Sequence, residues 1–224
     1  MRYYLPWLTV FSLGWPETNI LWIILVAHMA FWVVIAVRLG VSYYNRRSAD
    51  DSDADPSCVD VSGPVSSPWS VAILFLVSLT MGSYYALLVL WWINPSAVGP
   101  RLVPISLAFQ IGGIGLIVLG IALMCWSYMV LHSFRLLAQI EPDHQLCTHG
   151  PYARLRHPVY LGIDLFYWGS FLLLPHVGFL IPTLTNALAY DIRARIEEEV
   201  LQRAFGVQYH HYIERTYRLI PWLY

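Results

Sequence analysis

Two polar segments in the second half of the chain contain most of the side chains that could do chemistry. The first runs from residue 144 to residue 162 and holds imidazole, thiol, phenol and guanidinium groups. Four of its side chains are possible metal ligands: His144, Cys147, His149 and His157. Their spacing, H-x2-C-x-H-x7-H, matches none of the usual structural zinc patterns, so we expect hydrogen-bonding loop groups and no metal site.

The second segment, residues 191–206, has the pattern of a helix with two charged pairs. Arg193 and Glu197 are four residues apart, so their side chains share one helix face. Arg195 and Glu199 form a second pair with the same spacing on another face. A guanidinium can hold an anionic nucleophile, and a carboxylate can bind an ammonium group or hydroxyls. One pair is expected to face a site and the other water; the alternative is that both are solvated pairs that stabilise a juxtamembrane helix.

Asp164 is a further candidate, because it is an acid inside an apolar stretch. It lies one helical turn after Tyr160 and therefore on the same face. An acid in a membrane helix is costly, so it normally faces a partner or a wet cavity. The alternative is an interfacial acid near a helix N-terminus, stabilised by the helix dipole. His28, in the first apolar stretch, is expected to be a hydrogen-bonded histidine of the helix bundle.

The composition indicates what kind of protein positions these residues. Of the 224 residues, 58% are hydrophobic and 12% are charged, whereas an ordinary soluble domain has about a quarter charged residues. The net charge of −1 provides no field that would attract nucleic acid. A soluble domain of this composition would expose large apolar patches, so the sequence predicts an all-α integral membrane protein.

Four apolar stretches supply the membrane spans: residues 20–37, 71–93, 102–131 and 158–190. A hydrocarbon core about 30 Å thick needs roughly 20 apolar residues of helix, so the first three stretches each cross once. The fourth is too long for one helix and is interrupted at residues 175–178, which predicts a helical hairpin. We therefore expect about five transmembrane helices and a cytosolic amphipathic C-terminal helix that ends near Gly206. The glycine-rich run at 112–115 fails the dinucleotide-binding pattern and is expected to allow close helix packing.

Arginine placement gives the expected orientation. Arginines follow the first span and are frequent after the third, whereas the loop between the second and third spans has Arg101 alone. The positive-inside rule therefore puts the N-terminus outside and the chain after Leu131 in the cytoplasm. We divide the chain into residues 1–135, which hold the first three spans and a polar linker at 45–68, and a C-terminal catalytic region, residues 136–224.

Two composite motifs give the chain a resemblance to a known family. The first, residues 144–162, is a His-x-Leu-x-Thr-x-Gly-x-Tyr run that leads into Arg-His-Pro-x-Tyr-x-Gly. The second, residues 193–212, is Arg-x-x-x-Glu-Glu followed by Leu-x-x-x-Phe-Gly-x-x-Tyr-x-x-Tyr. In this order, and separated by an apolar hairpin, they make residues 136–221 resemble the isoprenylcysteine carboxyl methyltransferase family of membrane enzymes. The first two spans match that family only in being apolar.

The resemblance implies S-adenosylmethionine as the methyl donor, with S-adenosylhomocysteine as its product, in a cytosol-facing pocket over the hairpin. The family's cofactor-binding positions fall on nine residues of this chain: His144, Gln145, Leu146, Cys147, Tyr152, His157, Tyr160, Glu197 and Glu198. The substrate-binding arginine falls on Arg193, and the catalytic positions fall on Arg193, Arg156 and Glu197. The family has an amide side chain seven residues before the loop histidine, which is His144 in this chain. Here Leu137 occupies that position, so the chain departs from the family at this point.

The implied acceptor is a lipophilic or prenylated substrate that enters from the lipid bilayer, and its methylated group is first of all a prenylcysteine-like carboxylate. Such a carboxylate is ionised at pH 7 and needs no general base. A small thiol or a phospholipid amine would need one, for which His149 and Glu198 are candidates. The C-terminal architecture also resembles membrane sterol reductases, which use NADPH, and the histidines leave open a non-enzymatic membrane subunit that binds haem or a metal. The sequence leaves the oligomeric state open.

Overall fold

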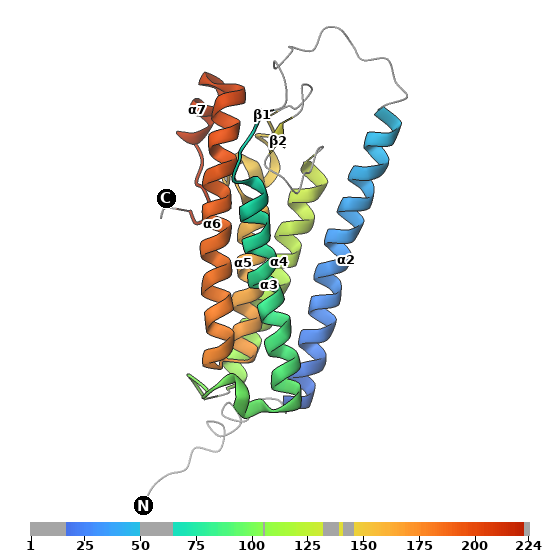
Figure 1. The fold of residues 1–224 in the computed structure, drawn as a ribbon, viewed down its shortest axis with the longest axis vertical. Coiled ribbons are helices and arrows are strands. Elements are labelled where there is room, and N and C mark those ends of the chain that lie inside the picture. Colours follow the sequence, from blue (N-terminus) through green and yellow to red (C-terminus); the bar gives the residue numbers. More distant parts are fainter. Residues whose placement is uncertain (1–16, 50–64, 105, 132–138, 141–145, 222–224) are drawn as a thin grey trace, which may run out of the picture.

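The computed structural model describes residues 17–49, 65–104, 106–131, 139–140 and 146–221. In these ranges five long helices form one bundle (Figure 1): α2 (Glu17–Ala49), α3 (Ser70–Ile93), α4 (Leu107–Val130), α5 (Pro158–Leu173) and α6 (Val177–Phe205). The shorter elements are η1 (Pro95–Val98), η2 (Gly150–Ala153), α7 (Val207–Ile213) and the antiparallel pair of β1 (Val65–Ser66) with β2 (Gln139–Ile140). Most of the polar linker predicted at 45–68 lies outside the described residues.

The helices have the lengths and composition of membrane spans. Three of those described are long and apolar enough to cross a membrane, at Asn19–Tyr44, Ser70–Ile93 and Leu107–Val130, and α5 is a shorter apolar helix. The predicted hairpin is confirmed, since α5 ends at Leu173 and α6 begins at Val177. The chain is therefore a multi-pass helical membrane protein, as its composition predicts.

The C-terminal amphipathic helix is an extension of the last membrane helix, and the expectation of a separate element is wrong. α6 continues for 29 residues, past the internal Pro182, and carries the polar segment 191–205 beyond the apolar bundle. It ends before Gly206, whose φ of +50° lies in the region that favours glycine. The charged residues of the second motif therefore have a fixed direction relative to the membrane part of the same helix.

The third span is shorter than predicted, because α4 begins at Leu107. Ser106 caps this helix by accepting a hydrogen bond from the amide of Phe109 at 3.3 Å. The segment before it pairs with the hairpin turn, where the amide of Leu102 donates to the carbonyl of Pro175 at 2.8 Å. These contacts place the loop before α4 and the α5–α6 turn at the same end of the bundle.

Helices α4 and α5 pack against each other through glycines. A methyl group added at Gly113 would lie 2.7 Å from the carbonyl oxygen of Gly169, and one at Gly120 would lie 2.5 Å from that of Gly162. Such distances leave no room for a side chain, so the two backbones are in direct contact. The packing role predicted for the glycine-rich run is thus confirmed for Gly113, whereas the other two glycines of the run face open space.

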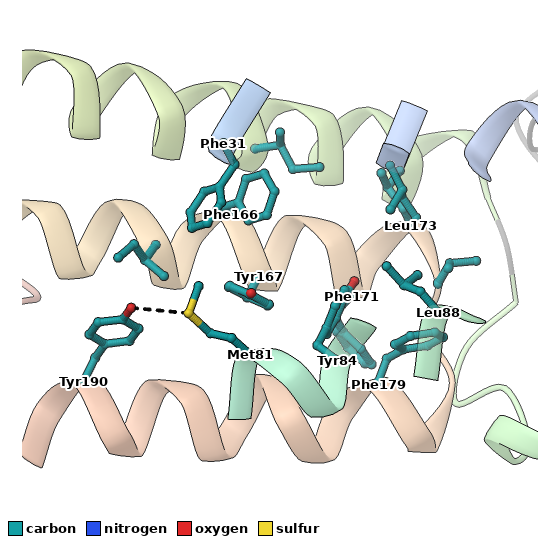
Figure 2. Close-up of a cluster of buried hydrophobic side chains, with 14 of the residues drawn as sticks. Phe31, Met81, Tyr84, Leu88, Phe166, Tyr167, Phe171, Leu173, Phe179 and Tyr190 are labelled. Carbon is teal, nitrogen blue, oxygen red and sulfur yellow. Dashed lines mark hydrogen bonds between the residues drawn. The ribbon is translucent and has the colours of Figure 1, made fainter. Parts of the chain in front are cut away.

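Aromatic side chains fill the middle of the bundle (Figure 2). Phe31 stacks on Phe166 with ring centroids 4.6 Å apart, and Tyr84 packs edge-on against Tyr167 at 5.0 Å. His28 lies among them, and its Nδ1 is 2.9 Å from the carbonyl oxygen of residue 24, whereas its Nε2 is buried with no hydrogen-bond partner among the described residues, so the expected hydrogen bonding is met at one ring nitrogen. Because lipid is itself apolar, these rings hold α2, α3 and α5 together by close van der Waals packing and not by their removal from water.

The two ends of the bundle differ in content (Figure 1). One end carries η1 and the α5–α6 turn, and the other carries β1, β2, α7 and the C-terminal part of α6. The first motif runs into the start of α5, and the second covers the end of α6 and most of α7, so both motifs lie at this second end. The expectation that the polar segments after residue 131 share one face is confirmed for the described residues.

Candidate functional site

The buried carboxylate of Glu198 joins the two motifs. Its Oε1 accepts a hydrogen bond from Arg156 Nε at 2.6 Å, and its Oε2 accepts one from Arg218 Nη2 at 2.8 Å. His157 Nε2 lies 3.5 Å from Oε1. Burial raises the pKa of Glu198, but the hydrogen bonds and charges of these three neighbours outweigh it and hold that pKa well below its usual range. Glu198 is therefore charged at neutral pH although its side chain is only 7% exposed.

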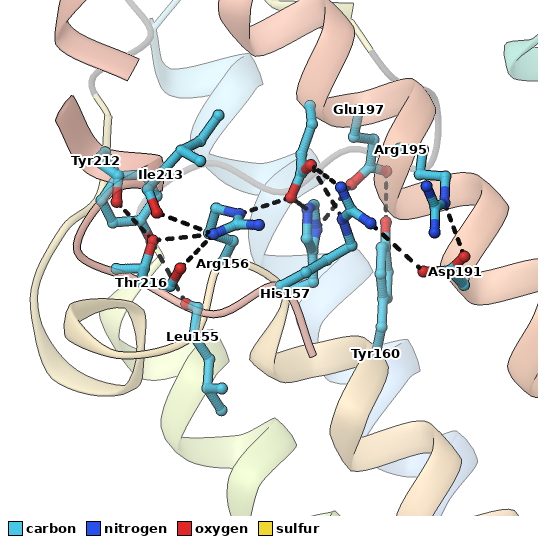
Figure 3. A network of polar contacts seen from close by, with 12 residues as sticks. Leu155, Arg156, His157, Tyr160, Asp191, Arg195, Glu197, Tyr212, Ile213 and Thr216 are labelled. Atoms are coloured by element: carbon cyan, nitrogen blue, oxygen red, sulfur yellow. Dashed lines mark hydrogen bonds and ion pairs between the residues drawn. The ribbon is translucent and has the colours of Figure 1, made fainter. Parts of the chain in front are cut away.

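Arg156 also ties the first motif to the segment that follows α7 (Figure 3). Its Nη1 donates to the carbonyl oxygen of Thr216 and, at 3.3 Å, to that of Ile213. The main chain makes parallel contacts, since the amide of Arg156 donates to the carbonyl of Tyr217 at 2.8 Å. Arg156 is thus held on several sides, and it fixes the start of α5 against the residues after α7.

A second cluster surrounds Glu197, the residue before Glu198. Tyr160 Oη donates to Glu197 Oε1, and Arg193 Nε donates to Tyr160 Oη at 2.8 Å and to Glu197 Oε1 at 3.1 Å. The guanidinium carbon of Arg193 lies 5.4 Å from the centre of the Tyr160 ring. His157 stacks on the same ring with centroids 5.3 Å apart. The predicted pairing of Arg193 with Glu197 is confirmed, and the first motif supplies Tyr160 and His157 to it.

The exposure of this pair suits it to bind a ligand. The side chain of Arg193 is 7% exposed and that of Glu197 is 20% exposed. Burial lowers the pKa of Arg193, but Tyr160 and Glu197 outweigh this and raise that pKa above its usual range, so the guanidinium stays charged. A permanent cation and a partly accessible carboxylate therefore lie side by side where the apolar part of α6 ends.

The other charged pairs of α6 lie on its outer surface. Arg195 Nε donates to Asp191 Oδ2 at 2.8 Å, with the arginine side chain 55% exposed. Glu199 lies 3.7 Å from Arg203, and both side chains are exposed. The described contacts thus include pairs of Arg195 with Asp191 and of Glu199 with Arg203, and the predicted Arg195–Glu199 pair stays a prediction. Both remain surface pairs, as expected for the face that points to water.

The loop expected to line the cofactor is described in part. Two of its predicted residues lie outside the described ranges: His144 and Gln145. Leu146 and Cys147 are half-buried, and Cys147 Sγ lies 3.8 Å from His149 Nδ1. Burial raises the pKa of the Cys147 thiol, which is therefore protonated at neutral pH. Tyr152 is buried on η2, where its carbonyl accepts a hydrogen bond from Tyr212 Oη at 2.7 Å.

Tyr128 and Arg38 were not predicted from the sequence as residues of this region. Tyr128, near the end of α4, is buried and lies within electrostatic reach of both Arg193 and Arg38. Arg38 belongs to α2, and its guanidinium carbon lies 6.0 Å from the centre of the Tyr128 ring. The sequence signal for these residues is an arginine and a tyrosine near the ends of apolar stretches, which is equally typical of interfacial anchors.

Asp164 is a partly buried acid, and three of the four possible metal ligands lie in the described residues. Asp164 lies one turn after Tyr160 in α5, and its Oδ1 is buried without a hydrogen-bond partner among the described residues. Within the same residues, no group of three or more His, Cys, Asp or Glu side chains could hold a metal ion. His144, one of the four possible ligands, lies outside them.

Comparisons with known proteins match the part of the chain that holds the site. The sequence profile of the phospholipid methyltransferase family matches residues 108–208. A protein-S-isoprenylcysteine O-methyltransferase of Tribolium castaneum is 36% identical over 96 residues, which are 41% of this chain and 34% of that protein. A probable protein-S-isoprenylcysteine O-methyltransferase of Oryza sativa subsp. indica is 30% identical over 84 residues, which are 37% of this chain and 44% of that protein.

A solved structure is similar as well. The eukaryotic intramembrane Ras methyltransferase, an isoprenylcysteine carboxyl methyltransferase, has a TM-score of 0.49 and 25% sequence identity to this chain. The superposition covers 68% of this chain and 53% of that one. The chain thus spans between 34% and 53% of the length of the relatives it matches.

The fold and the site define a class: multi-pass helical membrane proteins with a buried arginine–glutamate cluster at one end of a helical hairpin. The profile match runs over the helices that build this cluster, α4 to α6, and the sequence identities name one group of proteins. Over this region the chain is similar to protein-S-isoprenylcysteine O-methyltransferases and to the phospholipid methyltransferase family.

Proposed function

We propose that this chain is a membrane-embedded methyltransferase that uses S-adenosylmethionine to methylate the carboxylate of a lipophilic, prenylcysteine-like acceptor. The observation that carries the proposal is the contact of buried Arg193 with partly exposed Glu197 at the end of an apolar hairpin. In this contact Arg193 offers a positive charge to an anionic acceptor, and Glu197 offers a negative charge to a cationic donor. The identity to isoprenylcysteine methyltransferases supports the same reaction class.

The two adjacent glutamates differ in how well they fit the donor. The donor presents an ammonium group and ribose hydroxyls, which bind best to a charged carboxylate that they can reach. Glu197 fits, because its side chain is 20% exposed. Glu198 is 7% exposed, and Arg156 and Arg218 donate to its two oxygens, so we assign Glu198 and Arg156 to positioning the site and not to direct contact.

The residues around Arg193 supply orientation for the acceptor. When bound, the donor supplies an electrophilic methyl group to an oxygen nucleophile. An acceptor carboxylate is already ionised at pH 7, so no side chain of the site has to remove a proton. Arg193 would hold that carboxylate by its planar guanidinium. Tyr160, which contacts both Arg193 and Glu197, would fix the position of the acceptor relative to the donor. Tyr190, whose ring centroid is 5.0 Å from that of Tyr160, covers the cluster toward the membrane.

The arginine distribution supports an orientation with the N-terminus outside and the site in the cytoplasm. In this arrangement the polar donor arrives from the cytosol and the acceptor arrives sideways from the lipid. We propose residues 136–224 as the catalytic region and residues 1–135 as the part that supplies the first three spans. The glycine contacts of α4 with α5 support a close mechanical link between the two parts.

Calorimetric titration of the detergent-purified protein with S-adenosylhomocysteine, with NADPH as the comparison ligand, tests the donor class. We expect binding of the first ligand and none of the second. Glu197→Gln should weaken binding at least about tenfold, because a hydrogen bond to a charged group contributes about 1.5–3 kcal/mol. Glu199→Gln, which changes an exposed glutamate on the same helix, is the matched control. Binding of NADPH alone would favour a reductase. A Soret band in the absorption spectrum would favour a haem-binding subunit.

Methylation of a phospholipid amine is the second candidate, and two observations favour it. The matching profile is that of phospholipid methyltransferases, and Asp164 Oδ1 is a buried acceptor that lacks a hydrogen-bond partner among the described residues. A carboxylate at this place could accept the proton of an amine nucleophile. Transfer of labelled methyl groups to a prenylcysteine carboxylate or to phosphatidylethanolamine, in mixed micelles, separates the two. Under the first proposal Asp164→Asn leaves turnover nearly unchanged, and under the second it abolishes turnover.

A further inference from the structure

Arg38, on helix α2, is a buried charge outside both motifs. The residue is 8% exposed. Its Nη2 donates to the carbonyl oxygen of Leu131, just after α4, and its guanidinium carbon lies 6.0 Å from the centre of the Tyr128 ring. Its Nε is buried and has no hydrogen-bond partner among the described residues. The guanidinium therefore has donor capacity that the described contacts do not use.

The burial pattern of α2 sets Arg38 apart from its neighbours. The structure describes all residues from 32 to 44, and among them Arg38 is the only buried one. Val37 and Val41, on either side of it, are exposed apolar residues suited to contact lipid. A charge that turns inward from an apolar helix is costly unless it is paired or serves a site. An interfacial anchor would instead extend its charged end toward water.

Arg38 and Arg193, the arginine of the Glu197 cluster, share Tyr128 as a neighbour. Tyr128 lies within electrostatic reach of both Arg38 and Arg193, so the two guanidiniums belong to the surroundings of one ring. Tyr152, on η2, likewise lies within electrostatic reach of both Tyr128 and Arg38. Helices α2, α4 and α6 and the η2 turn therefore contribute side chains to one region. Two arginines beside aromatic rings favour an anionic head group that carries an apolar chain.

We propose that Arg38 is a second anion-binding residue of the acceptor site and that it selects acceptors that carry a carboxylate. The inference rests on the proposed function, because it concerns the head group of the same acceptor. An anionic amphiphile that enters beside α2 meets Arg38 at the membrane boundary and reaches Arg193 next to the donor. A prenylcysteine carboxylate has the required charge and apolar chain, whereas a zwitterionic phospholipid amine gains less from two arginines.

The test compares two ligands that differ only in charge, N-acetyl-S-farnesylcysteine and its uncharged carboxamide. Their affinities are measured in detergent, with S-adenosylhomocysteine present, for the wild type and for Arg38→Gln. We expect the wild type to prefer the carboxylate. Arg38→Gln should lower this preference about tenfold or more by weakening carboxylate binding alone, because it removes a charge-assisted hydrogen bond. Arg203→Gln, which changes an exposed arginine of α6, should keep the wild-type preference.

The outcomes separate this inference from the proposed function. If Arg38 only caps α4, Arg38→Gln lowers both affinities equally or neither, and the unchanged preference overturns the inference. If Arg38→Gln also loses S-adenosylhomocysteine, Arg38→Lys decides: a preserved preference supports anion binding, and its loss despite the retained charge overturns it. A wild type that binds S-adenosylhomocysteine but neither prenylated ligand overturns the proposed acceptor, and the inference with it.

Discussion

At the residue scale, the two adjacent glutamates of α6 have different surroundings. Successive residues of a helix point about 100° apart, so Glu197 and Glu198 face different neighbours. Glu198 meets two arginines and becomes part of the buried framework, whereas Glu197 meets Tyr160 and Arg193 and stays partly exposed. Neighbouring residues of one motif therefore support two separate roles, one in stability and one in binding.

The framework role of Glu198 predicts a loss of stability that depends on pH. Glu198→Gln takes the buried carboxylate away from two largely buried arginines, Arg156 and Arg218, which costs about 3 kcal/mol. That loss should lower the melting temperature at pH 7 by about 6 °C or more, measured by differential scanning fluorimetry in detergent. Glu199→Gln, one residue further on an exposed face, should change stability by less than about 0.5 kcal/mol.

The pH dependence follows from the depressed pKa of Glu198. A carboxyl whose pKa is lower in the folded than in the unfolded protein stabilises the fold above its ordinary pKa. This contribution is lost as the pH falls below about 4 toward the folded-state pKa. The difference in melting temperature between wild type and Glu198→Gln should therefore be largest near neutral pH and narrow in acid. A difference that grows in acid would contradict the assignment.

Arg193 predicts a kinetic effect that differs from that of Glu197. Arg193→Ala removes the expected partner of the acceptor but leaves the Tyr160–Glu197 hydrogen bond, so S-adenosylhomocysteine affinity should be largely kept. The value of kcat/KM for a prenylcysteine acceptor should fall at least about 100-fold, since orientation of the nucleophile is lost. Arg195→Ala, on the exposed face of α6, is the control. Loss of donor affinity together with turnover would make Arg193 a cofactor-binding or structural residue.

At the element scale, the site has a fixed geometry because its helices continue into the packed membrane bundle. α6 passes as one helix from the hairpin turn to Gly206, so its charged segment cannot rotate independently of the apolar part. α5 begins inside the first motif and is fixed to α4 by the glycine contacts. The distance between Tyr160 and Glu197 is therefore set by helix packing in the membrane.

This dependence on packing predicts different effects for two glycines of α4. A methyl group at Gly113 would lie 2.7 Å from the carbonyl oxygen of Gly169, so Gly113→Ala must push α4 and α5 apart. We expect it to destabilise the protein by about 1–3 kcal/mol and to weaken S-adenosylhomocysteine binding. Gly115→Ala, two residues later, places its methyl group in open space and should be neutral or stabilising by up to about 1 kcal/mol. Equal melting temperatures for the two variants would contradict the close contact.

The parts of the structure that the sequence predicts are those with a local cause. The hairpin follows from the length and interruption of one apolar stretch, and the Arg193–Glu197 pair follows from helical spacing. The contacts of Arg156 with Thr216 and of Arg38 with Leu131 join residues 60 and 93 positions apart, and no local pattern encodes them. The continuity of α6 was missed for a related reason, because a change in polarity at residue 191 suggests a new element although the hydrogen-bonded helix continues through it.

At the scale of the whole molecule, the charged groups gather at one end of an apolar bundle. Large apolar side chains are exposed along the outer helices, including Trp22, Phe75 and Val118, as expected for contact with lipid. The opposite end is joined by the α5–α6 turn and the loop before α4. The proposed reaction takes a donor that dissolves in water and an acceptor that dissolves in lipid. It therefore requires that the charged end lie on the side of the membrane that holds the donor.

This requirement predicts the topology in cells. In a background in which the three native cysteines are replaced by serine, Ala97→Cys in η1 and Gln208→Cys in α7 introduce exposed thiols at opposite ends of the bundle. A membrane-impermeant maleimide should label Ala97→Cys in intact cells, and Gln208→Cys only after permeabilisation, because the arginine-rich end stays inside. Labelling of both positions from one side would mean that the bundle does not span the membrane. The inverted pattern would leave the site without a cytosolic donor, so the proposed reaction requires the first result.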